Sequence, residues 1–464
     1  MYGRTRRLHF IGIGGIGMSG LAEVLLNMGY QVSGSDLKAT DVTERLVRAG
    51  GRVFIGHERS NIEGAQVVVY SSAVRAENPE LAAAREAGLP VIGRAEMLAE
   101  LMRMKYGIAV GGAHGKTTTT SMIAAVLARG GLDPTIVVGG RLKALGTNAR
   151  LGHGQFLVAE ADESDGSFLR LSPAVTVITN VDREHLEHYA GFDAIRQAFV
   201  YFANRVPFYG VAILCVDDPQ VREILPEVTK RHTLYGTRAE ADIRATEIEL
   251  VPHGSRFTVS SFGRELGRVE LQVPGRHNVL NALAAVAAGL EVEVGFGHVA
   301  EALEAFRGVA RRFETRGEAG GVRVVDDYGH HPTEIAATLA AAKPMAQRVL
   351  VIFQPHRYSR TSLLREEFGG CFGDAAAVWV LDIYAAGETP MAGVTGESLV
   401  ESAHEHGAKH VRWCPDPAQA VASVVAEARP GDLVLTLGAG DVWKLGDDVL
   451  ELLDSGATVG GGER

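Results

Sequence analysis

The segment GGAHGKTTTT, residues 111–120, carries residue types that could bind a nucleotide. A short apolar run from Gly107 to Val110 precedes it, and an Ala-rich helical pattern follows. Main-chain N–H groups of such a loop can surround phosphate oxygens, Lys116 can lie against the β- and γ-phosphates, and the Thr117 hydroxyl can bind Mg²⁺. The strict G-x-x-x-x-G-K-[ST] pattern fails at Val110. The order of strand, loop and helix still favours an ATP site.

Two clusters of polar residues follow expected strands downstream of this loop. The first contains Glu160, Asp162, Glu163 and Asp165, and the second contains Asn180, Asp182, His185 and His188. Ligands of an open parallel sheet lie beyond the carboxyl ends of its strands, so both clusters should face the same crevice as Lys116. Oxygen ligands there suit Mg²⁺. Asp162 and Asp165 could equally be helix caps or solvated turns. A functional role is favoured for Glu160, and a structural role is favoured more for His188 than for His185.

A second glycine motif lies near the N-terminus. Gly12, Gly14 and Gly17 have G-x-G-x-x-G spacing between an apolar run and a helical pattern. This spacing permits a tight turn that brings main-chain N–H groups close to a diphosphate, and Asp36 could accept a hydrogen bond from a ribose hydroxyl. The glycines do not distinguish a nicotinamide dinucleotide from another diphosphate, and a purely structural turn stays open.

Short Val- and Ile-rich runs alternate with helical patterns, which predicts an α/β protein with parallel sheets. The expected strands are Leu8–Ile13, Val67–Ser71, Gly107–Val110, Phe156–Glu160, Val175–Thr179, Val322–Asp326, Arg348–Phe353, Ala377–Ile383 and Leu433–Leu437. A length of 464 residues favours about three domains. We place their boundaries near residues 105 and 310, giving domains 1–105, 106–310 and 311–464.

Composition excludes several classes of protein. A formal charge of −10 disfavours nucleic-acid and anionic-membrane binding. Three distant cysteines without a C-x-x-C pair argue against a disulfide framework or a thiolate zinc site and fit a cytoplasmic protein. Glycines and Glu23 interrupt the first apolar run, so we expect neither a signal peptide nor a membrane span.

The chain resembles the Mur ligase family over nearly its whole length. The segments that carry the resemblance are GIGGIGMSG, GAHGKTTTT, EADESDGSF, TNVDREHLEHY, PGRHNVLNA, RRFE, DDYGHHPTE and FQPHRYSRT. The resemblance implies a Rossmann-like N-terminal domain that holds UDP, a central P-loop-type ATPase domain that binds Mg-ATP, and a Rossmann-like C-terminal domain that closes over both. It also implies ATP-dependent ligation of L-alanine to the carboxylate of UDP-N-acetylmuramate in peptidoglycan precursor synthesis. The reaction would pass through an acyl phosphate and release ADP and phosphate.

The resemblance implies a role for each matching residue. UDP-substrate binding would use Gly14, Gly15, Gly17, Asp36 and Ser71. ATP binding would use Gly111, Gly112, His114, Gly115, Lys116, Thr117, Thr118, Asn278, Asn281 and Arg312, and magnesium would use Thr117, Glu160 and His185. The alanine and the reacting centre would use Tyr328, His330, His356, Arg357 and Arg360. The implied catalytic residues are Lys116, Arg312, His330 and His356, with one of the two histidines as the base.

Each of these roles has a plain alternative. Asn278 and Asn281 could cap an Ala-rich helix. Arg311 and Arg312 could be a solvated pair, and His330 and His331 could belong to a packed turn, where we favour function for only one of them. Arg357 and Arg360 are three residues apart and could share a helical face that grips a carboxylate. Several relatives carry a modified lysine that supports a second magnesium, but residues 186–229 contain no lysine.

Rival functions remain at this stage. A recycling ligase that adds a preformed tripeptide to UDP-N-acetylmuramate would share both glycine motifs, although FQPHRYSRT favours the alanine enzyme. A non-catalytic nucleotide-binding protein and an NAD-dependent dehydrogenase are more distant rivals. We expect a monomer or a weak homo-oligomer.

Overall fold

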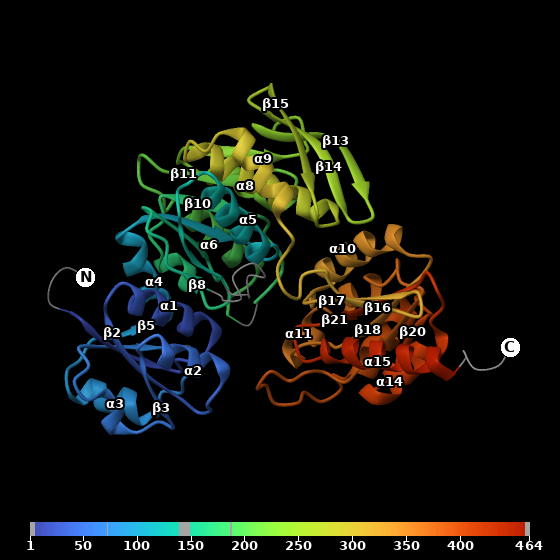
Figure 1. Cartoon of the computed structure of the whole chain (residues 1–464), viewed down its shortest axis with the longest axis horizontal. Helices are drawn as coiled ribbons and strands as arrows, with labels where there is room; N and C mark the ends of the chain where they lie inside the picture. The colour runs from blue at the N-terminus through green and yellow to red at the C-terminus, as the bar shows by residue number, and fades with distance from the viewer. Residues whose placement is uncertain (1–4, 72, 139–148, 186–187, 460–464) are drawn as a thin grey trace. The chain divides into compact units, whose positions relative to one another are not determined.

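The computed structural model describes residues 5–459 except 72, 139–148 and 186–187. Within these residues the chain divides into two compact units (Figure 1). Unit 1 comprises residues 1–247, 257–269 and 280–306, and unit 2 comprises residues 248–256, 270–279 and 307–464. Three sheets organise the molecule, and helices alternate with their strands along the chain, as expected for an α/β protein.

The N-terminal sheet has the strand order β3-β2-β1-β4-β5, and its pairs are parallel. Its strands are β1 (Arg7–Ile11), β2 (Gln31–Asp36), β3 (Arg52–Ile55), β4 (Val67–Tyr70) and β5 (Val91–Gly93), and its helices are α1 (Ile16–Asn27), α2 (Asp41–Arg48), α3 (Pro79–Glu86) and α4 (Arg94–Arg103). The first strand ends at Ile11, two residues before the expected end, because Gly12 turns the chain with a φ of 78°.

The central sheet has the order β15-β14-β13-β12-β11-β10-β6-β9-β7-β8 in the described residues. Its strands are β6 (Tyr106–Gly111), β7 (Thr135–Val137), β8 (Ala149–Arg150), β9 (Phe156–Glu160), β10 (Val175–Ile178), β11 (Val211–Cys215), β12 (His232–Gly236), β13 (Ile243–Val251), β14 (Gly254–Ser261) and β15 (Arg264–Leu271). The associated helices are α5 (Lys116–Arg129), α6 (Phe192–Ala203), α7 (Pro219–Ile224), α8 (Arg276–Glu291) and α9 (Phe296–Ala305). Because β10, β6 and β9 are parallel neighbours, their carboxyl ends lie at one edge of the sheet.

The C-terminal sheet has the order β16-β17-β21-β18-β19-β20, with β16 antiparallel to β17 and the other pairs parallel. Its strands are β16 (Glu314–Ala319), β17 (Val322–Asp327), β18 (Val349–Phe353), β19 (Ala377–Val380), β20 (Val411–Trp413) and β21 (Leu433–Leu437). Its helices are α10 (Pro332–Ala342), α11 (Tyr358–Leu363), α12 (Arg365–Gly370), α13 (Gly396–Glu405), α14 (Pro417–Glu427) and α15 (Lys444–Val459). Buried side chains from both faces of this sheet form two apolar clusters.

The structure confirms a strand at each of the nine expected positions, although β19 ends at Val380 rather than at Ile383. The α/β class and the three-domain architecture are therefore as predicted. Among the described residues, no helix is long and apolar enough to cross a membrane.

Candidate functional site

The loop between β6 and α5 is held from the neighbouring strand β10. Asn180 accepts a hydrogen bond from the His114 N–H group (2.8 Å) and donates one to the His114 carbonyl (3.1 Å). The Thr179 hydroxyl donates to the same carbonyl at 2.6 Å. Gly112 has a φ of 133°, and a Cβ atom there would lie 2.1 Å from the Thr179 hydroxyl oxygen. These contacts fix a loop in which only glycine fits at position 112.

Lys116 is the first residue of α5, and its side chain folds back over the loop. Its Nζ donates to the carbonyls of Gly112 (2.6 Å) and Ala113 (2.9 Å) and lies 2.8 Å from Glu163 Oε1. Burial alone would lower the pKa of the ammonium group, but the carboxylates of Glu163 and Glu184 outweigh it, so the pKa of Lys116 is raised. Lys116 is therefore a partly buried, positively charged side chain at the N-terminus of α5.

Three ligand-type side chains next to Lys116 could hold a metal ion. Glu163, Glu184 and His185 each present one atom, and these atoms lie within 4.8 Å of one another. His185 Nε2 is 3.8 Å from Glu163 Oε1 and 3.7 Å from Glu184 Oε2. A left-handed backbone at His185, with a φ of 54°, accompanies this arrangement. Two carboxylates and an imidazole can bind a divalent cation such as Mg²⁺.

Of the three residues predicted to bind magnesium, one belongs to this group. His185 belongs to it, whereas Glu160 ends β9 opposite Val110 of β6 and Thr117 is buried in the first turn of α5. Their role as ligands stays a prediction. Glu184 was not proposed from the sequence, because residues 182–188 contain four other carboxylate or imidazole side chains and spacing does not single it out.

The helix α8 reaches the loop through Asn281. Its Oδ1 accepts a hydrogen bond from the Thr119 hydroxyl (3.1 Å) and would lie 2.7 Å from a Cβ atom built on Gly115. Gly115 has a φ of 80°. Asn281 therefore joins α8 to the start of α5 and does not cap α8, while Asn278 donates to the Pro274 carbonyl at 2.7 Å in the manner of a local cap.

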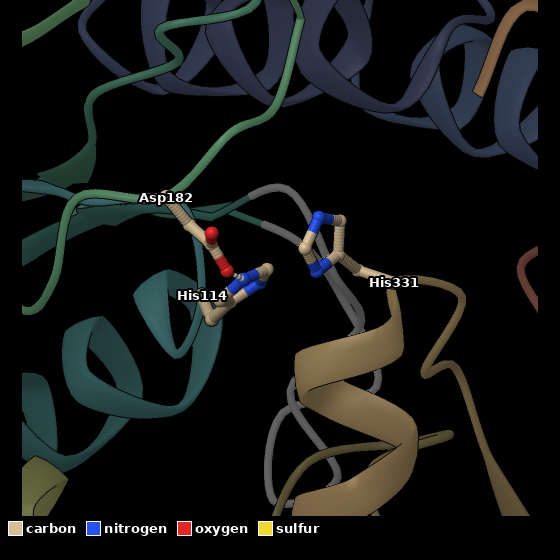
Figure 2. A group of neighbouring side chains, drawn as sticks. All are labelled: His114, Asp182 and His331. Atoms are coloured by element: carbon tan, nitrogen blue, oxygen red, sulfur yellow. Dashed lines mark hydrogen bonds and ion pairs between the residues drawn. The ribbon is translucent and has the colours of Figure 1, made fainter. Parts of the chain in front are cut away.

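His114 adds a further contact between the loop and the segment after β10. Its Nε2 lies 2.8 Å from Asp182 Oδ2. Figure 2 shows these two side chains facing each other. The hydrogen bond orients the imidazole at the loop's tip. The neighbouring predicted phosphate contacts, Gly111 and Thr118, are both buried, Gly111 at the end of β6 and Thr118 in α5. Their binding roles stay predictions.

The N-terminal glycine turn lies between β1 and α1. The Ser35 carbonyl accepts hydrogen bonds from the N–H groups of Gly12 (2.9 Å) and Ile13 (3.0 Å). Asp36 Oδ2 accepts from the Gly14 N–H group at 2.8 Å. Gly15 is the N-cap residue of α1, and a Cβ on Gly12 would lie 3.5 Å from Ser71 Cβ. Ser71 therefore lies beside the turn, as its predicted role requires.

Asp36 stabilises the main chain, in addition to its predicted contact with a ribose hydroxyl. Its other oxygen, Oδ1, accepts from the Leu37 N–H group at 2.8 Å. Both carboxylate oxygens therefore hold the main chain of the turn. Contact with a ribose hydroxyl stays a prediction and would use the remaining lone pairs.

The predicted site residues of unit 2 include two adjacent arginines, Arg311 and Arg312. Both guanidinium groups lie 5.0 Å from the centre of the Tyr328 ring. Arg311 also contacts Asp326 Oδ2 (3.1 Å) and the carbonyls of Gly438 and Gly440. Arg312 lies 3.7 Å from Glu334. The alternative of a solvated pair is therefore wrong: Arg311 anchors the segment, and Arg312 packs on Tyr328.

Two predicted histidines come together in unit 2. The rings of His330 and His356 are 5.7 Å apart, and His356 stacks on Tyr384 at 5.6 Å. His330 Nδ1 is 3.1 Å from the Tyr328 carbonyl and 3.3 Å from Glu334 Oε2. Burial, the neighbouring His330 and nearby guanidinium groups lower the pKa of His356 to about 3. His356 is thus a neutral imidazole at physiological pH.

His331 is the N-cap residue of α10 (Figure 2). Its Nδ1 accepts a hydrogen bond from the Thr333 N–H group at 3.3 Å. Whether only one of His330 and His331 serves the site stays a prediction.

Arg357 and Arg360 both act on His356. Arg360 Nη1 is 3.3 Å from His356 Nδ1, and the charges of both arginines lower the pKa of His356. Arg357 is the N-cap residue of α11, with a φ of 69°, so it precedes the helix that contains Arg360. The prediction that both lie on one helical face is wrong in that detail. Tyr384, which stacks on His356, was not proposed because it lies 28 residues further along the chain and outside the motif FQPHRYSRT.

Known proteins resemble this chain over most of its length. Three family models match consecutive parts of the chain: "Mur ligase family, catalytic domain" at residues 7–106, "Mur ligase middle domain" at 110–289 and "Mur ligase, glutamate ligase domain" at 311–440. A UDP-N-acetylmuramate–L-alanine ligase from Geobacter sp. (strain M21) is 56% identical over 97% of this chain and 98% of that protein.

Solved structures show the same architecture. The UDP-N-acetylmuramate-alanine ligase MurC from Thermotoga maritima has a TM-score of 0.80 and 29% identity, and the match covers 97% of this chain and 99% of that one. A murein peptide ligase from Psychrobacter arcticus has a TM-score of 0.71 and 23% identity, with the same coverage. On the family models and on the identity with the Geobacter protein, the chain belongs to the Mur ligase family.

Proposed function

We propose that this chain joins L-alanine to the carboxylate of UDP-N-acetylmuramate at the expense of ATP. The observation that carries the proposal is the cluster around Lys116, in which a partly buried ammonium and three side chains that could hold a metal ion lie beside a glycine loop. Relatives more than 50% identical over nearly the whole chain bear the name of that ligase. The likeness to a murein peptide ligase is 23% identical and supports the fold alone.

The loop suits a triphosphate. Gly112 and Gly115 have left-handed backbones, and side chains at these positions would collide with Thr179 and Asn281. Because these two positions carry no side chains, the main-chain N–H groups at the start of α5 are open to anionic oxygens. Lys116 would exchange its carbonyl contacts for the β- and γ-phosphates, while Thr117 and Thr118 lie in the first turn of the same helix.

Glu163, Glu184 and His185 are the side chains we assign to Mg²⁺, with Thr117 and Glu160 as further predicted ligands. Two of the three are carboxylates, which suit this hard cation. When bound, the ion would supply positive charge to the phosphate oxygens.

The first step joins the substrate carboxylate to the γ-phosphorus. A carboxylate oxygen forms the new P–O bond, and the bond to the β-phosphate oxygen breaks, so that ADP leaves with the electron pair. Repulsion between a carboxylate and a polyphosphate opposes this approach, and preorganised cations lower the barrier. Lys116 provides one such charge, and Arg312, which packs on Tyr328, is assigned to the γ-phosphate.

The second step forms the amide. The alanine nitrogen attacks the acyl carbon, the bond to the phosphate oxygen breaks, and inorganic phosphate leaves. The amine must lose a proton, which a histidine of unit 2 can accept. A base with a pKa of about 3 accepts protons poorly, so we assign the base to His330 and a hydrogen-bonding role to His356. Arg357 and Arg360 would hold the alanine carboxylate.

Phosphate release from ATP tests the proposal directly. Purified protein is given UDP-N-acetylmuramate with L-alanine or with a preformed tripeptide, and each component is omitted in turn. We expect release that requires Mg²⁺, the UDP-sugar and L-alanine. Release only with the tripeptide would assign the chain to the recycling reaction, and no release with either acceptor would favour a nucleotide-binding protein. A cytoplasmic location and a monomer or weak homo-oligomer remain our predictions.

A further inference from the structure

Arg94 lies between the glycine turn and the acidic loop that follows β9. It is the first residue of α4, a helix that contacts α1 within unit 1 (Figure 1). Its Nη2 donates to Asp162 Oδ2 at 3.1 Å. Asp162 therefore holds one nitrogen of the guanidinium group.

The other terminal nitrogen of Arg94 faces the start of α1. A Cβ atom built on Gly17 would lie 2.8 Å from Arg94 Nη1 and 2.9 Å from Arg94 Cδ. Gly17 lies inside α1, and its backbone does not adopt the left-handed region. The backbone at position 17 is therefore not in the left-handed region, and a Cβ atom there would have to displace the Arg94 side chain.

We propose that Arg94 binds the diphosphate of the UDP-sugar substrate and that Asp162 is its positioning residue. This inference rests on the proposed function, which places a diphosphate at the N-terminus of α1. A guanidinium group presents several N–H donors in a fixed plane, so Nη2 can stay on Asp162 while Nη1 and Nε donate to phosphate oxygens. The ion pair holds the side chain ready, which reduces the entropy lost on binding.

The position of Asp162 adds a link to the ATP loop. The next residue, Glu163, contacts Lys116 at 2.8 Å. Arg94 and Lys116 therefore bind adjacent residues of one short loop, each through a carboxylate. The diphosphate of one substrate and the phosphates of the other would thus approach the same acidic segment from two sides.

A purely structural role makes a different prediction. Asp162 and Arg94 are both partly exposed, and such ion pairs contribute little to stability. If the pair only fastened α4, its loss would not discriminate between ligands that differ by one phosphate. The comparison of UDP with UMP therefore separates the two roles.

Calorimetric titration of the full-length protein with UDP and with UMP provides the test. We expect Arg94→Ala to weaken UDP binding by at least about 10-fold, as for a lost charge-assisted hydrogen bond, and to weaken UMP binding by less than about 3-fold. Arg103→Ala is the matched control, because Arg103 ends the same helix and pairs with Glu100 at the surface. Unchanged UDP affinity, or equal losses for UDP and UMP, would overturn the inference.

Further variants keep the test independent of one substitution. Gly17→Ala should reduce the UDP preference in the same way, because its Cβ displaces a flexible guanidinium group rather than the main chain. Asp162→Asn should weaken UDP binding about 2- to 5-fold in the wild type and not at all in the Arg94→Ala background. In steady-state assays Arg94→Ala should raise the KM for the UDP-sugar and leave that for ATP unchanged. An Asp162→Asn effect that persists without Arg94 would contradict the positioning role.

Failure of the proposed function gives a separate result. If wild-type protein binds no UDP, the substrate assignment itself is wrong, whatever Arg94 does. If wild-type protein binds UDP and Arg94→Ala binds it equally well, the substrate assignment stands and the role of Arg94 is refuted.

Discussion

The cluster around Lys116 and the cluster around His356 have opposite electrostatic environments. Lys116 is a cation among carboxylates, and Glu163 and Glu184 raise its pKa. His356 is an imidazole next to His330 and among the guanidinium groups of Arg357 and Arg360, which together with burial lower its pKa to about 3. The first environment favours cations, and the second favours anions.

This difference indicates how one chain can assemble an amide bond. Surplus carboxylates near the ATP loop can hold Mg²⁺, which neutralises the nucleotide. Surplus guanidinium groups in unit 2 can hold the carboxylate of an amino acid and also disfavour protonation of nearby bases. A cationic environment of this kind helps keep a bound amine in its unprotonated, nucleophilic form. The surroundings of Lys116 and of His356 thus differ in charge, and each charge suits one of the two steps of the reaction.

Replacing Lys116 should have the largest effect. We expect Lys116→Met to lower kcat about 1,000-fold, because the variant loses a preorganised charge at the transferring phosphate. UDP binding, measured by calorimetry, should stay within about 2-fold of the wild type. Arg129→Ala, at the exposed end of the same helix, is the control and should leave kcat unchanged. Retention of more than a tenth of the activity in Lys116→Met would remove Lys116 from the reaction.

Much of the fold was predictable from local sequence patterns. Runs such as Val349–Phe353 are buried on both faces of a parallel sheet, so they are apolar throughout and easy to recognise. The loop before Lys116 was predictable for a similar reason, because left-handed backbones at Gly112 and Gly115 require glycine. These features depend on residues that are close in sequence.

The remainder of the site depends on distant contacts. Arg94 and Asp162 are 68 residues apart, and Tyr384 lies 28 residues beyond His356, so no spacing rule joins either pair. Glu184 could not be identified from the sequence for another reason. The run DREHLEH offers several possible ligands, and the left-handed backbone of His185 is part of what brings Glu184 and His185 toward Glu163. Such a local conformation of a non-glycine residue has no signature in a single sequence.

The cationic cluster should matter next. The double variant Arg357→Gln/Arg360→Gln should raise the KM for L-alanine about 100-fold, since each lost charge-assisted hydrogen bond costs about 1.5–3 kcal/mol at most and the two share one carboxylate. The KM for ATP should change less than about 3-fold. Arg412→Gln/Arg429→Gln, two exposed arginines of unit 2, form the control. Equal increases for alanine and ATP would show that the cluster does not select the amino acid.

The carboxylate-rich cluster can be tested through its metal. His185→Ala should raise the Mg²⁺ concentration that gives half-maximal activity at least about 10-fold, because it removes a candidate ligand. Saturating Mg²⁺ should restore part of the rate. His188→Ala, three residues further along, is the control, since His188 packs against Tyr189 and lies outside the metal-capable group. An unaltered Mg²⁺ dependence in His185→Ala, or the same shift in both variants, would exclude His185 as a ligand.

The smallest expected effect is on the pH dependence of stability. The pKa of His356 is about 3 in the folded protein, below its ordinary value of 6.5, so between these values the unfolded chain binds more protons. Stability contributed by neutral His356 is therefore full above about pH 6.5 and is lost as the pH falls toward 3. Between pH 7.5 and 5 this loss should be on the order of 1 kcal/mol for a partly buried group.

His356→Gln should remove that part of the loss. Denaturant unfolding of wild type and variant at pH 7.5 and 5 measures it, with His232→Gln, an exposed histidine of unit 1, as the control. The pKa of His277, which burial lowers to about 4, gives the wild type a second contribution of the same sign, and this should survive in His356→Gln. If His356→Gln and His232→Gln lose stability equally between the two pH values, burial and the neighbouring cations do not hold His356 neutral, and the electrostatic contrast with Lys116 fails.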